Sequence, residues 1–252
     1  MSGQLTIVGL GPGPEGWITP AASEAVANAN IVLGYTQYVS RLIPRAGQIF
    51  EASDNREEIA RAERALTLAA DGQRVAVVSG GDPGVFAMAA AVFEAVERNP
   101  ASAHGIDVRV EPGITAMLAA AARIGAPLGH DFCAISLSEN LKPWATIETR
   151  LRLAAEADFV IALYNPASKA RPDQIGKAFG VLSACRAPET VVVFARAVGR
   201  KDESIDVTTL ADVAGMECDM RTLVLIGSRS TRKIEADDGR AWVYTPRFAR
   251  GE

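Results

Sequence analysis

The residues best suited to bind a ligand lie in one glycine-rich stretch, Ser79–Phe86, of sequence SGGDPGVF. It follows an apolar segment typical of a buried strand, Arg74–Val78, and precedes a segment typical of a helix, Ala87–Glu97. Its glycines let a ligand approach the main chain at the carboxyl end of a strand, where open α/β sheets bind ligands. Asp82 adds one carboxylate. The stretch predicts a binding loop, and the alternative is a connection that merely needs glycine.

Residues for metal or nucleophilic chemistry are scarce. The chain has two histidines, His104 and His130, and neither lies in a recognisable catalytic motif. We expect His104 to be solvated in a turn and His130 to be structural or to contact substrate. The three cysteines, Cys133, Cys185 and Cys218, lack the spacing of a metal site or a disulfide framework. The sequence therefore predicts no metal site and a reducing, cytoplasmic environment.

The composition indicates a folded protein with a large core. Of 252 residues, 48% are hydrophobic and 22% are charged, with a formal net charge of −4. This length suits one large domain or two of ordinary size, and the negative charge argues against general nucleic-acid binding. The chain begins directly with a strand-like segment, without a signal-peptide pattern, and its apolar helices are too short to span a membrane. We expect neither nucleic-acid nor membrane partners.

Two further glycine-bearing turns follow predicted strands in the first half. Gly9–Pro14 follows the strand Gln4–Val8, and Pro112–Ala116 follows the strand Ile106–Val110. The first turn is similar to a dinucleotide fingerprint, but no acidic residue for a ribose follows the next strand, Ile31–Leu33, so we reject a nicotinamide site. A phosphate-binding loop is disfavoured as well, because the Ser79–Phe86 stretch has no lysine.

Helix boundaries in the first half are indicated by capping residues. Thr19 is suited to cap a helix that begins at Pro20. A longer helix is predicted over Asp54–Asp71, with Asp54 as its cap and Gly72 as its stop. Thr115 could cap a helix or present its hydroxyl to a ligand.

The second half predicts a mixed sheet. Two helices are expected, over Thr146–Ala157 and from Pro172 onward. The predicted strands are Phe132–Ser136, Phe159–Leu163, Val191–Phe194, Ser204–Thr208 and Thr222–Gly227. Successive strands with little helix between them favour partly antiparallel pairing. The pattern changes around residues 112–128, which predicts an N-terminal α/β domain over residues 1–118 and a C-terminal one over residues 119–252.

Four motifs together resemble a known family. They are Val8–Gly13, Gly80–Phe86, Pro112–Ala116 and Tyr164–Pro166, and their order and spacing cover nearly the whole chain. The set resembles the tetrapyrrole methylases, the class III S-adenosylmethionine-dependent methyltransferases. The resemblance implies two α/β domains with a cleft between them, S-adenosyl-L-methionine as the methyl donor, and a homodimer.

Two stretches narrow the resemblance to one reaction. Cys133–Trp144 and Ala157–Pro166 are similar to the family members that methylate C17 of the corrin ring in cobalamin biosynthesis. This implies methylation of precorrin-3B at C17 with ring contraction to precorrin-4. The alternative is the same fold acting on cobalt-factor III or on another corrin position.

The resemblance also assigns residues to roles. The implied donor-binding positions are Pro12, Gly80, Gly81, Asp82, Val85, Thr115, Ala116, Asn165 and Ala195. At Asn165 the family often has an apolar residue, so the sequence departs from the pattern there. The candidates for positioning or acid/base help in the ring contraction form a polar loop: Ser138, Glu139 and Lys142. The alternative is a surface loop that makes no contact with the substrate. The arginines that could pair with substrate carboxylates, or could be surface charges, are Arg41, Arg45 and Arg171.

Overall fold

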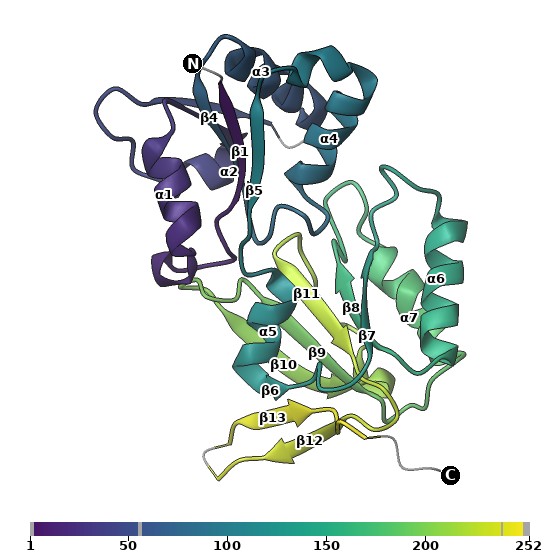
Figure 1. Ribbon diagram of the computed structural model, residues 1–252. Coiled ribbons are helices and arrows are strands. Elements are labelled where there is room, and N and C mark those ends of the chain that lie inside the picture. The colour runs from purple at the N-terminus through teal and green to yellow at the C-terminus, as the bar shows by residue number, and fades with distance from the viewer. Residues whose placement is uncertain (1–2, 55–56, 238, 249–252) are drawn as a thin grey trace. The chain divides into compact units, whose positions relative to one another are not determined.

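The computed structural model describes residues 3–54, 57–237 and 239–248. The chain divides into two compact units, Met1–Ala116 and Met117–Glu252, and each unit has its own five-stranded sheet (Figure 1). The boundary expected after residue 118 lies inside the helix α5 (Ala116–Ile124). Each unit is described by itself below.

The first unit is built on a parallel five-stranded sheet. Its strands are β1 (Gln4–Gly9), β2 (Ile31–Tyr35), β3 (Ile49–Ser53), β4 (Arg74–Ser79) and β5 (Asp107–Glu111). They are arranged in the order β3-β2-β4-β1-β5, and every neighbouring pair is parallel. Since parallel strands end at the same edge, the turns that follow β1, β4 and β5 all lie at one edge of this sheet.

Helices cover both faces of the first sheet, with α1 and α2 on one side and α3 and α4 on the other (Figure 1). Their bounds are α1 (Pro20–Asn28), α2 (Thr36–Val39), α3 (Glu58–Ala70) and α4 (Met88–Arg98), and single 3₁₀ turns span Glu15–Trp17 and Pro100–Ala103. Alternate strand residues enter the two cores: Leu5 and Ile7 pack with α3 and α4, and Val8 packs with α1. This double burial explains the nearly continuous apolar strands.

Two capping predictions have opposite outcomes. Thr19 caps α1 as expected, because its hydroxyl accepts the Ala22 amide at 3.1 Å and Pro20 is the first helical residue. The prediction that Asp54 caps the next helix was wrong, because α3 begins only at Glu58. Asp54 lies ahead of the helix, where its carbonyl accepts from the buried guanidinium of Arg61 at 2.6 Å. Residues 55 and 56 of the expected helix lie outside the described residues.

The second unit contains a mixed five-stranded sheet. Its strands are β7 (Phe132–Ser136), β8 (Val160–Tyr164), β9 (Val191–Arg196), β10 (Ser204–Thr209) and β11 (Thr222–Ile226), in the order β10-β9-β11-β8-β7. Only the β7–β8 pair is parallel, as the expected mixed sheet requires. Helices α6 (Trp144–Glu156) and α7 (Gln174–Ser183) pack on one face, and a 3₁₀ turn spans Leu210–Asp212. Figure 1 shows α5 away from α6 and α7.

Some strands give little signal in the sequence. A three-stranded sheet pairs β12 (Arg232–Glu235), β13 (Ala241–Tyr244) and β6 (Gly125–Ala126), and none of these was predicted. All four residues of β12 are exposed, so no apolar alternation marks the strand. The edge strand β3 was missed for a similar reason, since it has no fully buried residue.

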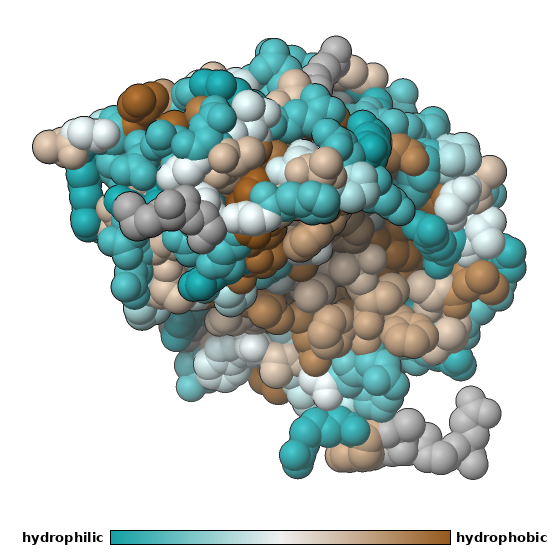
Figure 2. Space-filling model, turned by 45° about the horizontal axis from the view of Figure 1, so that its top comes forward, coloured by the Kyte–Doolittle hydropathy of each residue, from teal (hydrophilic) through white to brown (hydrophobic). Residues whose placement is uncertain are grey.

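Figure 2 shows hydrophilic residues over much of the face that it draws, together with a broad area of apolar residues. The most exposed large apolar side chains include Ile43 and Leu141, both 89% exposed. In the described part of the chain, no helix combines the length and the apolar character that crossing a membrane requires.

Candidate functional site

The loop after β4 owes its shape to its glycines. Gly81 has a φ of +67° and Phe86 a φ of +53°, which is the left-handed region where glycine is at ease and a phenylalanine is strained. A Cβ added to Gly80 would lie 2.6 Å from the ring atom Cε1 of Tyr38. Strained residues often occur at binding sites, so the loop has the character of a functional turn rather than a plain connection.

Three loops meet at the carboxyl edge of the first sheet. Gly11 and Gly81 exchange two backbone hydrogen bonds, both of 3.1 Å. A Cβ added to Gly9 would lie 2.6 Å from the Gly113 nitrogen and 2.8 Å from the Gly81 oxygen. A Cβ on Gly113 would overlap with the Gly81 carbonyl. The three glycine motifs of the sequence are therefore one packed structure, in which backbone touches backbone.

Asp82 links two of these loops. One carboxylate oxygen accepts the Gly84 amide at 2.8 Å, and the other accepts the Gly113 amide at 3.0 Å. A carboxylate that accepts backbone amides makes charge-assisted hydrogen bonds, which are stronger than neutral ones. Asp82 was expected to offer its acid to a ligand, and in this structure each oxygen binds a loop amide. Its observed role is to hold the third loop against the second.

The other predicted donor positions of the first unit gather around the same loops. A Cβ on Gly81 would be 3.7 Å from the Thr115 Cα and 3.9 Å from the Ala116 nitrogen. Thr115 is only 6% exposed. Pro12 directly follows Gly11, and Val85 closes the turn with its amide 3.3 Å from the Asp82 carbonyl. All seven predicted positions of this unit thus lie at one edge of the sheet, and their contact with a donor stays a prediction.

In the second unit, Asn165 and Ser138 both donate hydrogen bonds to the hydroxyl of Ser136, which the sequence did not indicate as a site residue. Asn165 follows β8 with a φ of +53°, and its amide donates to Ser136 Oγ at 2.9 Å. The Ser138 amide donates to the same oxygen at 3.3 Å. Ser136, at the end of β7, is 4% exposed. A buried serine at a strand's carboxyl end is the signal that could have identified it.

Glu139 and Lys142 occupy different environments in the polar loop. The Glu139 carboxylate accepts from the Gln174 amide at 2.5 Å, and Gln174 is 4% exposed at the start of α7. The Gln174 side-chain oxygen is buried without a hydrogen-bond partner in the described structure. Burial lowers the pKa of Lys142, and the nearby charge of Arg150 lowers it further. The loop therefore offers a positioned carboxylate and an ammonium that loses its proton more readily than usual.

Ala195 lies inside β9 rather than in a loop. It is 1% exposed, and it is paired with Ile205 of β10 on one side and Leu223 of β11 on the other. A strand flanked on both sides has no free edge for a ligand. The left-handed residue at the end of this strand is Ala197, with a φ of +51°, and sequence reasoning missed it because nothing in the residue type predicts that conformation.

The three candidate arginines differ in their settings. Arg41 donates from Nη1 to the Gly11 carbonyl and from Nη2 to two further carbonyls of the first loop. Arg45 is exposed. Arg171 exchanges backbone hydrogen bonds of 2.9 Å with Ser168, and its Nη1 is buried without a partner in the described structure. The hypothesis that Arg41 pairs with a substrate carboxylate gives way to a contact with the protein's own backbone.

The histidines behave as structural or solvated residues. His104 is exposed in a turn, as expected. His130 is half-buried, and its Nδ1 accepts the amide of Asp131 at 2.8 Å. This local contact agrees with the structural alternative for His130.

Cys133 and Cys218 are not poised for nucleophilic chemistry. All three are free and half-buried. Burial raises the pKa of Cys133, and it raises the pKa of Cys218 to about 12 with help from the charge of Asp219. Both thiols therefore remain protonated at neutral pH, whereas a nucleophile needs the thiolate. Within the described residues, no cluster of three or more His, Cys, Asp or Glu side chains could hold a metal ion.

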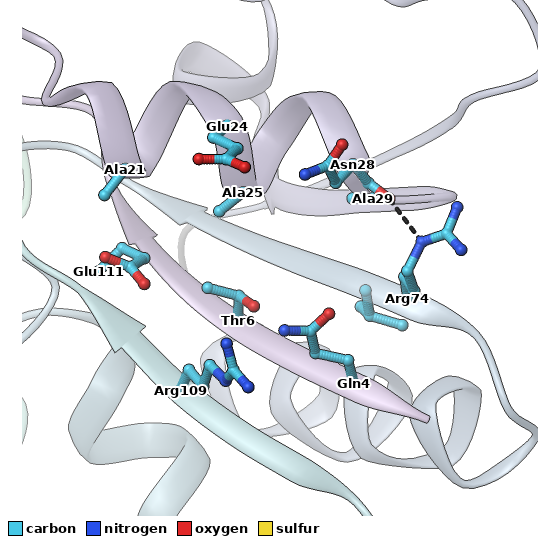
Figure 3. A pocket seen from close by; sticks show the side chains of 11 residues that line it. Gln4, Thr6, Ala21, Glu24, Ala25, Asn28, Ala29, Arg74, Arg109 and Glu111 are labelled. Atoms are coloured by element: carbon cyan, nitrogen blue, oxygen red, sulfur yellow. Dashed lines mark hydrogen bonds between the residues drawn. The ribbon is translucent and has the colours of Figure 1, made fainter. Parts of the chain in front are cut away.

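A small polar hollow of about 210 Å³ lies between α1 and the β1–β5 edge of the first sheet. Figure 3 shows Gln4 and Thr6 of β1 and Arg109 and Glu111 of β5 beneath the side chains of α1, such as Glu24. Ligand pockets commonly have roughly 300–1,000 Å³. None of the predicted donor positions lines this hollow. We therefore place the candidate site at the three loops.

Comparison with known proteins identifies the fold family. A sequence model of the tetrapyrrole (corrin/porphyrin) methylases matches residues 4–214. The chain belongs to this family. The matched segment includes all three loops and the predicted positions of the second unit.

Individual relatives match the whole chain or most of it. It is 57% identical to a precorrin-3B C(17)-methyltransferase from Sinorhizobium sp. over 251 residues, which cover 100% of this chain and 99% of that protein. It is 42% identical to a probable cobalt-factor III C(17)-methyltransferase from Salmonella typhimurium, covering 90% of this chain and 93% of that one.

Solved structures agree on the fold. The crystal structure of the methyltransferase CobJ superimposes with a TM-score of 0.92 at 51% identity, covering 97% of this chain and 100% of that chain. A uroporphyrin-III C-methyl transferase from Thermus thermophilus, complexed with S-adenyl homocysteine, gives a TM-score of 0.66 at 24% identity and covers 89% of this chain and 97% of that one. The second likeness supports the fold alone.

A single added methyl group tests whether the loop contact builds the site. Gly113→Ala would push a Cβ into the Gly81 carbonyl. Overpacking of this kind costs about 1–3 kcal/mol, so we expect a lower free energy of unfolding and at least a ten-fold weaker affinity for S-adenosylhomocysteine, measured by urea denaturation and titration calorimetry.

The matched control is Gly16→Ala, because a Cβ at Gly16 meets nothing within 4 Å. It should bind S-adenosylhomocysteine as the wild type does. Equal affinities for the Gly113→Ala variant and the wild type would contradict the assignment of the three loops as a donor site.

Proposed function

We propose that this methylase transfers the methyl group of S-adenosylmethionine to C17 of precorrin-3B, with contraction of the ring to precorrin-4 in cobalamin biosynthesis. The proposed substrate rests on the 57% identity to a precorrin-3B C(17)-methyltransferase over the full chain. The packed glycine loops support the donor site, because they form a backbone-lined edge where a bulky ligand can approach closely. Donor contacts are proposed for Pro12, Gly80, Gly81, Val85, Thr115 and Ala116, with Asp82 as the residue that fixes the loops.

Methyl transfer needs positioning more than activation. The sulfonium carbon is already an electrophile: C17 supplies an electron pair to the methyl carbon, the carbon–sulfur bond breaks, and its electrons return to sulfur in S-adenosylhomocysteine. Holding the two reactants in line can supply roughly 7–11 kcal/mol of the barrier. The raised pKa values of the Cys133 and Cys218 thiols fit a reaction that requires no protein nucleophile.

The ring contraction needs movement of a proton from the C20 hydroxyl. We assign this help to the polar loop of the second unit. Glu139, held by Gln174 at 2.5 Å, is suited to accept a proton. Lys142, whose pKa is lowered by burial, is suited to exchange one. Ser138, whose amide is fixed on Ser136 at 3.3 Å, can orient the substrate hydroxyl. Asn165 shares that serine hydroxyl, so we propose that it shapes the same site.

A cobalt-containing substrate is the alternative. The relative named as a probable cobalt-factor III C(17)-methyltransferase is 42% identical over nearly the whole chain. The reaction at C17 would be the same, and the difference lies in the acceptor. The higher identity to the precorrin-3B enzyme favours the metal-free substrate.

The deciding experiment offers three acceptors in parallel to the purified protein. S-adenosylmethionine with a ¹³C-labelled methyl group is incubated with precorrin-3B, cobalt-factor III or precorrin-2 in a single turnover. We expect label at C17 of a contracted ring from precorrin-3B alone, read by mass spectrometry and carbon NMR. Label from cobalt-factor III alone would replace the proposed substrate. If no acceptor is methylated while S-adenosylhomocysteine still binds, the corrin assignment fails.

We also propose that the protein acts as a homodimer of two-domain subunits, on the strength of the family resemblance. The chain has a mass of 26.6 kDa. Light scattering on the purified protein should give twice that mass at micromolar concentration. A mass equal to one chain, unchanged on concentration, would contradict the homodimer and leave the methyl-transfer proposal untouched.

A further inference from the structure

One short segment of the first unit touches both the first and the second loop of the candidate site. It comprises the helix α2 and the residues up to Arg41, and it follows β2 at the same edge of the sheet. Tyr38 faces Gly80, and Arg41 faces the loop after β1. Neither residue belongs to a glycine motif. We call this segment, residues 36–41, the clamp.

Arg41 binds the first loop through three carbonyls. Its Nη1 donates to the Gly11 carbonyl at 2.9 Å, and its Nη2 donates to the Leu10 carbonyl at 2.8 Å and the Gly13 carbonyl at 2.9 Å. A planar guanidinium presents its donors in a fixed fork, which a lysine ammonium cannot reproduce. These bonds fix the backbone on both sides of Pro12.

The Gly11 carbonyl has a second partner that matters here. It also accepts the Gly81 amide at 3.1 Å, in the backbone pair that joins the first loop to the second. Both lone pairs of one oxygen are thus used, one by Arg41 and one by the glycine-rich loop. Loss of the hydrogen bond from Arg41 to the Gly11 carbonyl would therefore also disturb the contact between the first and second loops.

Tyr38 supports the second loop from the same segment. A Cβ on Gly80 would lie 2.6 Å from its ring, so the ring packs directly on the glycine backbone. The neighbouring Tyr35 holds the ring in an edge-on contact, with centroids 5.4 Å apart. The clamp therefore places a planar side chain against each of two loops.

We propose that Arg41 is a positioning residue for the methyl donor: it fixes the Leu10–Gly13 backbone so that the joined loops are preformed before the donor binds. This inference rests on the proposed methyl transfer. Preorganisation acts on affinity for the donor, because an unfixed loop must be ordered during binding. The corrin acceptor and the chemical step should depend on Arg41 far less.

The test compares Arg41→Ala and Arg41→Lys with Arg64→Ala in the full chain. Arg64 is the matched control, because it forms an exposed ion pair with Glu51 in the same unit at 3.0 Å. Titration calorimetry with S-adenosylhomocysteine and steady-state kinetics with precorrin-3B are the readouts. We expect Arg41→Ala to raise the Kd and the donor KM by at least ten-fold with kcat changed less than three-fold. Arg41→Lys should fall between, and Arg64→Ala should match the wild type.

Chemical rescue separates positioning from general destabilisation. Millimolar guanidinium should restore part of the donor affinity of Arg41→Ala and leave Arg64→Ala unchanged. If Arg41→Ala does not fold, Arg41→Lys carries the test. Wild-type donor affinity in a folded Arg41 variant, or a fall in kcat with an unchanged donor KM, would overturn the proposal. If the wild-type protein itself binds no S-adenosylhomocysteine, the proposed function fails instead.

Discussion

The structure of the candidate site depends on the absence of side chains at three glycines. Gly9, Gly81 and Gly113 bring the ends of β1, β4 and β5 so close that a Cβ on Gly9 or Gly113 would meet backbone atoms of the other loops. The three loops can meet because the parallel strands β1, β4 and β5 end at the same edge of the sheet. The sheet order places β1 between β4 and β5, and each of the three loops touches the other two.

Polar side chains then stabilise the three loops that the glycines allow to meet. Asp82 accepts amides from the second and third loops, and Arg41 donates to carbonyls of the first. The Asp82 carboxylate thus accepts hydrogen bonds from backbone amides, and the Arg41 guanidinium donates hydrogen bonds to backbone carbonyls. Partly buried backbone groups need such partners when the sheet ladder ends. The first unit therefore reaches a defined loop geometry by its own contacts, which is the property that an in-line methyl transfer requires.

Much of the fold could be predicted from the sequence, and the reasons are physical. Buried strands such as β1, β4 and β8 are apolar runs bounded by glycine or proline, and Thr19 and Gly72 mark helix ends through capping chemistry that is local. Strands β3 and β12 escaped prediction because they lack buried residues. The prediction that Asp54 caps a helix was wrong because a residue suited to capping does not by itself fix where the helix begins.

The sequence predicted which loops form the candidate site, and the contact of these loops with a donor stays a prediction. The glycine motifs identify the loops, but their contacts with one another join residues far apart in the chain. Arg41, Ser136 and Gln174 are recognised only by the distant atoms that they bind. Ala195, assigned by resemblance, lies inside a strand that is paired on both sides, and its contact with a donor stays a prediction.

The contacts among the three loops come from the protein alone, so we expect the loops to be joined in the ligand-free protein. Hydrogen–deuterium exchange of the ligand-free protein, followed by mass spectrometry of peptides that span Gly11, Gly81 and Gly113, measures this directly. Slow exchange in all three peptides, slowed further by S-adenosylhomocysteine, is the predicted result. Exchange as fast as in an exposed turn, such as the one at Gly105, would show that the loops are not joined in the ligand-free protein.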